Sequence, residues 1–179
     1  PAAAKRARSF LQHTGSGISS RYAEDLLIAE NVFPGLMQEE DTFTGDAETE
    51  VRDQLGRAYG TEGRYVHLGP FGMNAIYATY RALSQIQEPA RRQEWIQFGW
   101  LFMDTIETLR KLHPPDVQNH AIHSTLHLEL LETLLRDRGA HVAGLFTEVP
   151  SNPLMQTPDV EKLRELGDRH GCAIVIDAT

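Results

Sequence analysis

Short apolar runs alternate with stretches of helical periodicity along most of the chain. Such runs, bounded by Gly, Pro and polar residues, are typical of strands. The sequence predicts five strands, at residues 65–68, 95–98, 121–122, 142–149 and 172–176. The last is a continuous apolar run, as expected of a buried parallel strand at the centre of a sheet.

Apolar residues recur at helical spacing between these runs. The predicted helices cover residues 46–59, 73–83, 104–112, 124–138 and 157–170. Asp46, Glu48 and Glu50 stand at the start of the first helix, where acidic groups favour the helix dipole, and Gly60 follows its end. Strands that alternate with helices predict an α/β protein, with a mainly parallel sheet covered by helices on both faces.

The first part of the chain does not follow this pattern. Residues 1–41 contain a Gly/Ser-rich stretch around Gly15 and Gly17 and one short helical segment at 23–29, and we interpret them as an N-terminal arm. Residues 42–179 form the regular α/β part. Because no covering helix follows the fifth strand before Thr179, we expect the polypeptide to continue beyond this residue.

Composition excludes several classes of protein. The 179 residues carry 17 Lys and Arg against 25 Asp and Glu, a net charge of -8, which argues against binding to nucleic acid or an anionic membrane. No apolar run approaches the roughly 18 residues of a membrane helix. The single cysteine, Cys172, predicts a cytoplasmic protein. The alternative is an organelle transit segment, because Lys5, Arg6 and Arg8 stand near the start.

Candidate chemistry lies after the predicted strands, where ligands bind in open α/β sheets. Gly72 and Met73 follow the first strand and open a helix, Phe102 follows the second, Asn152 the fourth, and Asp177 and Thr179 the fifth. Backbone N–H groups, an aromatic ring, an amide and a carboxylate together suit a planar, phosphorylated ligand with a ring nitrogen.

These residues resemble a known family. The run 148–154 (Glu-Val-Pro-Ser-Asn-Pro-Leu), followed by 175–179 (Val-Ile-Asp-Ala-Thr), is similar to the pyridoxal-phosphate enzymes of cysteine and methionine metabolism, which have fold type I. Residues 72–76 resemble the family's phosphate loop, and 97–105 resemble the cystathionine γ-synthases of fungal type. The resemblance implies pyridoxal 5'-phosphate as cofactor and makes 42–179 the first part of the domain that binds it.

The resemblance also implies a role for each candidate residue. Gly72 and Met73 would bind the phosphate, Phe102 would stack on the ring, Asn152 would donate to its phenolic oxygen, Asp177 would hold the ring nitrogen protonated, and Thr179 completes the Asp-x-Thr motif. The alternatives are purely structural: a tight turn at Gly72 and Met73, a core phenylalanine at Phe102, an Asn-Pro turn at Asn152 and a helix-capping aspartate at Asp177.

The sequence departs from the family at several positions. Phe102 replaces a tyrosine, Ala178 replaces an asparagine, and residues 42–49 do not match the motif by which a partner subunit contacts the phosphate; Arg21 and Tyr22 are a weak substitute. The lysine that binds the cofactor covalently is expected beyond Thr179, because none of Lys5, Lys111 and Lys162 is suitably placed.

The resemblance implies a transsulfuration enzyme that forms a homodimer or homotetramer. Its small-molecule substrate would be a sulfur amino acid or an activated homoserine, which undergoes elimination or replacement. The alternative is a catalytically inactive protein that keeps the fold as a binding or structural subunit. A dinucleotide site is not predicted because no Gly-x-Gly-x-x-Gly occurs, and His120, His123 and His127 are not expected to bind a metal.

Overall fold

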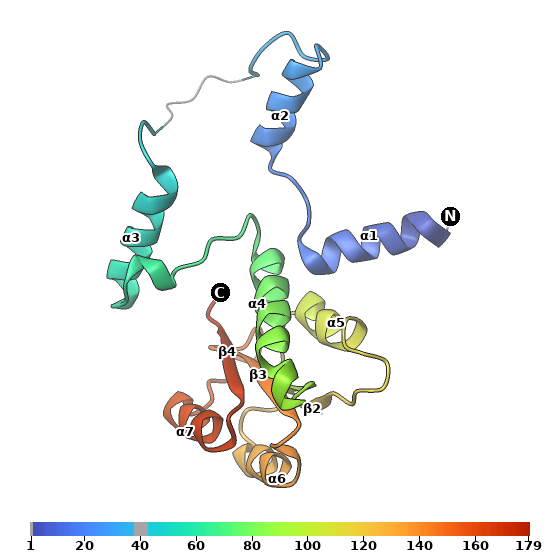
Figure 1. Ribbon diagram of the computed structural model, residues 1–179, viewed down its shortest axis with the longest axis vertical. Helices are drawn as coiled ribbons and strands as arrows, with labels where there is room; N and C mark the ends of the chain where they lie inside the picture. Colours follow the sequence, from blue (N-terminus) through green and yellow to red (C-terminus); the bar gives the residue numbers. More distant parts are fainter. Residues whose placement is uncertain (1, 38–42) are drawn as a thin grey trace.

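Four parallel strands form the single sheet of the computed structural model, which describes residues 2–37 and 43–179 (Figure 1). The strands are β1 (Glu94–Phe98), β2 (His120–Ile122), β3 (Val142–Glu148) and β4 (Ala173–Asp177), in the order β2-β1-β3-β4. Each neighbouring pair is parallel, for example with Ile96 beside Leu145 and Glu148 beside Asp177. The predicted fold class is therefore confirmed.

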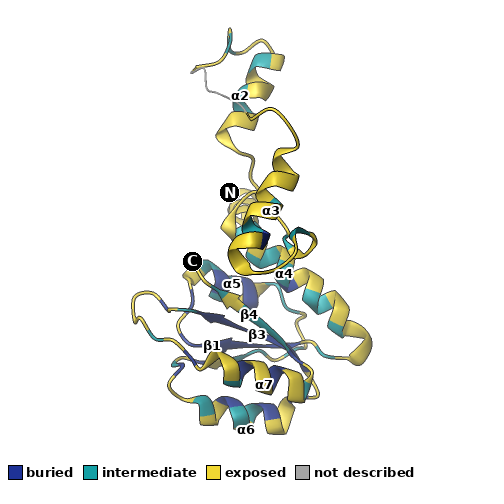
Figure 2. Ribbon diagram, turned by 90° about the vertical axis from the view of Figure 1, so that its left-hand side faces the viewer, coloured by how far each residue is buried: buried dark blue, intermediate teal, exposed yellow. Residues whose placement is uncertain are grey.

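Helices cover both faces of the sheet (Figure 2). One face packs against α4 (Gly72–Gln87) and α5 (Met103–Lys111), and the other against α6 (Leu128–Arg138) and α7 (Val160–His170). Alternation along β1 explains the two cores, because Trp95 packs with the first pair of helices while Ile96 and Phe98 pack with the second.

A register shift between β1 and β3 lies next to Trp95. The shift lies between Glu94 and Trp95, which pair with Val142 and Gly144. A Cβ atom at Gly144 would lie 2.8 Å from this ring and 2.8 Å from the carbonyl oxygen of Ala173. Glycine at this position therefore lets the indole lie directly on the sheet.

The N-terminal part contains three helices, α1 (Ala2–Thr14), α2 (Ser20–Ala29) and α3 (Ala47–Tyr59), and 3-10 turns occur at Gly63–Tyr65 and Glu88–Ala90. Helix α3 was predicted, with Asp46 capping its start and Gly60 in the left-handed conformation after its end. Helix α1 was not predicted. The proposed boundary between residues 41 and 42 lies outside the described residues. No helix in the described ranges is long and apolar enough to span a bilayer.

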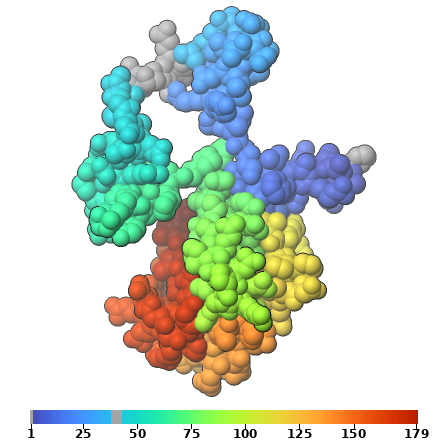
Figure 3. Space-filling model, in the orientation of Figure 1, coloured from blue at the N-terminus to red at the C-terminus, as the bar shows by residue number. Residues whose placement is uncertain are grey.

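The end of α1 docks on the α/β part of the chain (Figure 3). Backbone carbonyl groups at this end accept hydrogen bonds from α4 and α5. Asn74 Nδ2 of α4 donates to Thr14 O at 3.3 Å, and Thr108 Oγ1 of α5 donates to His13 O at 3.0 Å. Gly15 follows with φ +58° and lies directly against the first turn of α4. The end of the arm is thus integrated with α4 and α5, whereas α2 has no buried residue.

Three predictions at this level were wrong. Residues 65–68 form no strand: the 3-10 turn closes through a hydrogen bond from Tyr65 N to Glu62 O, and Tyr65 is 62% exposed, so no sheet face is available to bury the run. Strand β4 was expected to be buried but is only partly buried, and it is outermost among the four strands of this chain. Ser124 does not cap α6, because the helix begins at Leu128. The Oγ of Ser124 instead accepts a hydrogen bond from Leu126 N at 3.3 Å.

Replacing Glu94 with glutamine is expected to lower the free energy of unfolding by about 1–3 kcal/mol at neutral pH. The buried Glu94 carboxylate accepts from His120 Nε2 at 2.8 Å and pairs with Arg138, joining β1 to β2 and α6. Burial raises the pKa of Glu94, but the hydrogen bonds from Arg138 and His120 outweigh this effect, so its pKa lies below the ordinary 4.5.

This lowered pKa makes the contribution of Glu94 dependent on pH. A carboxyl group of this kind stabilises the fold above pH 4.5, and the stabilisation is lost as the pH falls through the folded-state pKa. Urea unfolding of the wild type and of Glu94→Gln should therefore differ most at neutral pH and converge in acid. A difference that stays constant down to pH 3 would contradict the assignment.

Candidate functional site

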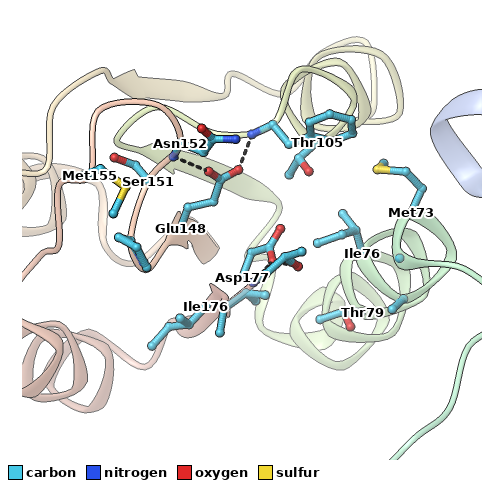
Figure 4. A pocket seen from close by; sticks show the side chains of 17 residues that line it. Met73, Ile76, Thr79, Thr105, Glu148, Ser151, Asn152, Met155, Ile176 and Asp177 are labelled. Carbon is cyan, nitrogen blue, oxygen red and sulfur yellow. Dashed lines mark hydrogen bonds between the residues drawn. The ribbon is translucent and has the colours of Figure 1, made fainter.

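A pocket of about 710 Å³ opens at the carboxyl ends of β3 and β4, between the first turns of α4 and α5 (Figure 4). Four chain segments line it. The lining residues are Gly72, Met73, Ala75, Ile76 and Thr79; Phe102 and Thr105; Glu148, Pro150, Ser151, Asn152 and Met155; and Val175, Ile176, Asp177, Ala178 and Thr179. The site lies where parallel α/β sheets place their ligands.

The structure brings all six residues predicted from the sequence to this pocket. Gly72 and Met73 begin α4, and Phe102 immediately precedes α5. Asn152 follows β3, and the pair Asp177 and Thr179 ends β4. Residues more than 100 positions apart along the chain thus converge, while their roles toward a ligand remain predictions.

The start of α4 offers backbone donors to the pocket. Phe71 precedes the helix and makes no capping hydrogen bond with its side chain. A Cβ atom added at Gly72 would meet no described atom within 4 Å, so there is open space beside this first turn. Free N–H groups and the positive end of the helix dipole suit an anionic group such as a phosphate.

Asp177 is held in one orientation by Thr179. Its Oδ1 accepts from Thr179 N at 3.0 Å and from Thr179 Oγ1 at 2.6 Å. Its backbone carbonyl accepts from Val149 N at 2.9 Å, which fixes the strand end. Among the described residues Oδ2 has no hydrogen-bond donor, so this oxygen is available to a ligand that offers a proton.

Glu148 is a buried site residue that the sequence analysis did not single out. Its Oε1 accepts from Phe102 N, and its Oε2 accepts from Asn152 N at 3.3 Å. Figure 4 shows this carboxylate between the two loops. An acidic residue at the end of an otherwise buried strand was the available signal.

Ser151 and Thr105 were also missed. Ser151 closes the loop after β3, because its N–H donates to Gln156 O at 2.9 Å and its Oγ accepts from Gln156 N at 3.1 Å. This closed loop holds Met155 in the left-handed conformation, with φ 53°. Thr105 is 2% exposed, and its Oγ1 has no hydrogen-bond partner among the described residues. It therefore brings an unsatisfied hydroxyl group to the pocket wall.

The charged side chains of the described pocket wall are both acidic, Glu148 and Asp177. The lysines lie elsewhere: Lys5 is in α1, Lys111 pairs with Glu107 at 2.7 Å, and Lys162 pairs with Glu165 at 3.2 Å. Within this part of the structure, the positive end of α4 is therefore the main attraction for an anion.

The three histidines noted in the sequence do not converge. His120 contacts Glu94, and His127 Nδ1 lies 3.2 Å from Glu129 Oε1 on the surface. Residues 2–37 and 43–179 contain no group of three His, Cys, Asp or Glu side chains placed to bind a metal ion.

Comparisons with known proteins identify relatives, although no protein-family model matches the chain. L-2-amino-4-chloropent-4-enoate dechlorinase/desaturase of Streptantibioticus cattleyicolor is 39% identical over 174 residues, which are 96% of this chain and 34% of that protein. Cystathionine gamma-synthase of Neurospora crassa is 37% identical over 116 residues, 64% of this chain and 18% of that protein. Alanine racemase of Aspergillus violaceofuscus is 27% identical over 206 aligned positions, 98% of this chain and 34% of that protein.

The chain therefore spans only about a third of two of these relatives and less of the other, at 34%, 18% and 34% of their lengths. The match to the bacterial relative extends over almost the whole chain, at 96%, and so includes most of the N-terminal arm.

Proposed function

The chain is homologous to a part of the cystathionine γ-synthase-like proteins, a family of pyridoxal-phosphate enzymes, and on that premise we propose that its pocket binds pyridoxal 5'-phosphate. The observation that carries the proposal is the convergence of Gly72, Met73, Phe102, Asn152, Asp177 and Thr179 on this one pocket. Residues 42–179 would then be the first part of the cofactor-binding domain.

The residues present fit this cofactor. The uncapped first turn of α4 suits the phosphate, and the unpaired Asp177 Oδ2 suits a protonated ring nitrogen. Phe102 offers a ring for stacking, Asn152 an amide donor, and the unsatisfied Thr105 Oγ1 a further polar contact. Bound pyridoxal phosphate supplies an electron sink for the charge that develops when a bond to the amino acid's Cα breaks.

Several residues of the pocket then have a defined role toward the cofactor. Asp177 keeps a proton on the ring nitrogen, and Thr179 holds the carboxylate in the orientation for this. The closed loop after β3 and the apolar residues Met73 and Met155 shape the pocket wall. Because Phe102 has no hydroxyl group, it orients a ring but cannot transfer a proton.

We propose an amino-acid substrate that undergoes elimination or replacement of a side-chain substituent, such as a sulfur amino acid or an activated homoserine. The names of the bacterial and fungal relatives support this class of reaction. The covalent lysine would come from residues after Thr179. An inactive protein that keeps the fold is the alternative, supported by the replacement of the family's tyrosine by Phe102.

The experiment treats the complete protein with pyridoxal phosphate and then borohydride, and maps the modified peptide by mass spectrometry. We expect one phosphopyridoxyl group, on a lysine other than Lys5, Lys111 or Lys162. If the protein binds the cofactor but shows neither a phosphopyridoxyl-lysine adduct nor turnover, the inactive alternative would be favoured. Absence of cofactor binding would refute the proposal.

We further propose that the protein assembles as a homodimer or homotetramer. The N-terminal part carries large apolar side chains at its surface, including Met37, Tyr59 and Val32, which are 79%, 76% and 62% exposed. Exposed apolar surface on this scale is typical of interfaces. Light scattering after size-exclusion chromatography would test this, and a well-folded monomer would contradict it.

A further inference from the structure

We infer that Glu148 is a positioning residue, whose carboxylate holds the loop that carries Phe102 and the loop that carries Asn152 side by side at one wall of the pocket. The inference rests on the proposed function, because it concerns how these two residues are presented to the cofactor. It assigns a role to a side chain that has no part in the proposed chemistry.

The two oxygens of Glu148 serve different chain segments. Oε1 accepts from the backbone N–H of Phe102, 46 residues away, and Oε2 accepts at 3.3 Å from that of Asn152. Figure 4 shows the side chain of Glu148 reaching from the end of β3 into the space between the loops. A single carboxylate thus binds both loops.

The position of the carboxylate explains why an acid is tolerated there. Glu148 ends a strand whose seven residues are all buried, and it is itself 8% exposed. Phe102 precedes α5 and makes no side-chain capping hydrogen bond, so the helix start gains a negative partner from Glu148. Two N–H donors and the helix dipole offset the loss of hydration.

Both bonds are needed to fix the geometry. The hydrogen bonds of Phe102 N and Asn152 N fix the backbone from which the phenyl ring and the side-chain amide extend. Loss of one hydrogen bond would let one loop shift by a fraction of an ångström, which is enough to weaken the binding of a rigid, planar ligand.

The test is Glu148→Gln in the complete protein. Glutamine keeps one acceptor oxygen but presents an NH2 group to the second N–H, so one bond is lost while size is preserved. The matched control is Glu94→Gln, because Glu94 is 7% exposed against 8% for Glu148, and it lies at the amino end of β1, away from the pocket. Both variants remove a buried carboxylate.

Three quantities separate positioning from a general loss of stability. The first is the rate of amide hydrogen exchange at Phe102 and Asn152 without ligand, the second the affinity for pyridoxal phosphate, and the third the induced circular dichroism of the bound cofactor. For Glu148→Gln we expect faster exchange at one or both amides, affinity reduced about tenfold and an altered dichroic band, as the loss of one charged hydrogen bond implies. For Glu94→Gln we expect all three to match the wild type.

Unchanged exchange at both amides in Glu148→Gln would overturn the inference, as would equal effects of the two variants on the three quantities. A wild-type protein that binds no pyridoxal phosphate would instead refute the proposed function. The exchange rates would then still decide whether Glu148 holds the two loops together.

Discussion

Replacing Asp177 with asparagine in the complete protein is expected to lower turnover by about 100- to 1000-fold, the usual effect of removing one preorganised electrostatic group from an active site. Asparagine can still accept the hydrogen bonds from Thr179 N and Oγ1, so the strand end should keep its conformation. What is lost is the negative charge that keeps the ring nitrogen of the cofactor protonated. Steady-state kinetics, with the absorbance spectrum of the bound cofactor, would measure both effects.

Asp159→Asn is the matched control for this variant. Asp159 caps α7 by accepting from Lys162 N at 2.9 Å and does not line the pocket. Asparagine caps helices as well as aspartate does, so its turnover should stay near that of the wild type. Undiminished activity in Asp177→Asn would show that the charge of Asp177 has no role in turnover.

Replacing Gly15 with alanine is expected to lower the free energy of unfolding by about 2–5 kcal/mol, the sum of a left-handed alanine and an overpacked contact. Gly15 has φ +58°, and a Cβ atom there would lie 2.3 Å from Asn74 N and 2.9 Å from Met73 C. Both are backbone atoms of the first turn of α4, which cannot move aside as a flexible side chain can. Urea unfolding would measure the loss.

Gly60→Ala isolates the contact from the backbone strain. Gly60 has a similar φ of +65°, but no atom of the described residues lies within 4 Å of its Cβ position, so alanine there should cost about 1–2 kcal/mol. We expect Gly15→Ala also to weaken pyridoxal phosphate binding, because the displaced turn begins at Gly72. Equal losses of stability in the two variants would show that the Gly15 contact contributes nothing.

The elements that the sequence predicts well are those whose pattern and burial agree. Residues 95–98 and 142–149 are apolar runs that lie between two layers of helices, and they form β1 and β3. The run 65–68 has the same local composition but no neighbouring strand, and it stays outside the sheet. Strand propensity alone therefore does not determine pairing, which depends on contacts distant in sequence.

The six candidate site residues could be found because each stands at a strand end or within a recognisable motif. Glu148, Ser151 and Thr105 could not be assigned in this way. Their importance lies in tertiary contacts, such as the bond from Phe102 N to Glu148, that join segments far apart in the chain. A buried acid in a sequence gives no indication of its donors.

The strand order also has a consequence for the protein during synthesis. Both neighbours of β1 come later in the chain, and its partner β3 is completed only when Glu148 has been made. Until then at least one edge of the apolar β1 is unpaired, and an unpaired edge is a template for pairing with other nascent chains. A chaperone would therefore reduce aggregation most during the synthesis of the residues between β1 and β3.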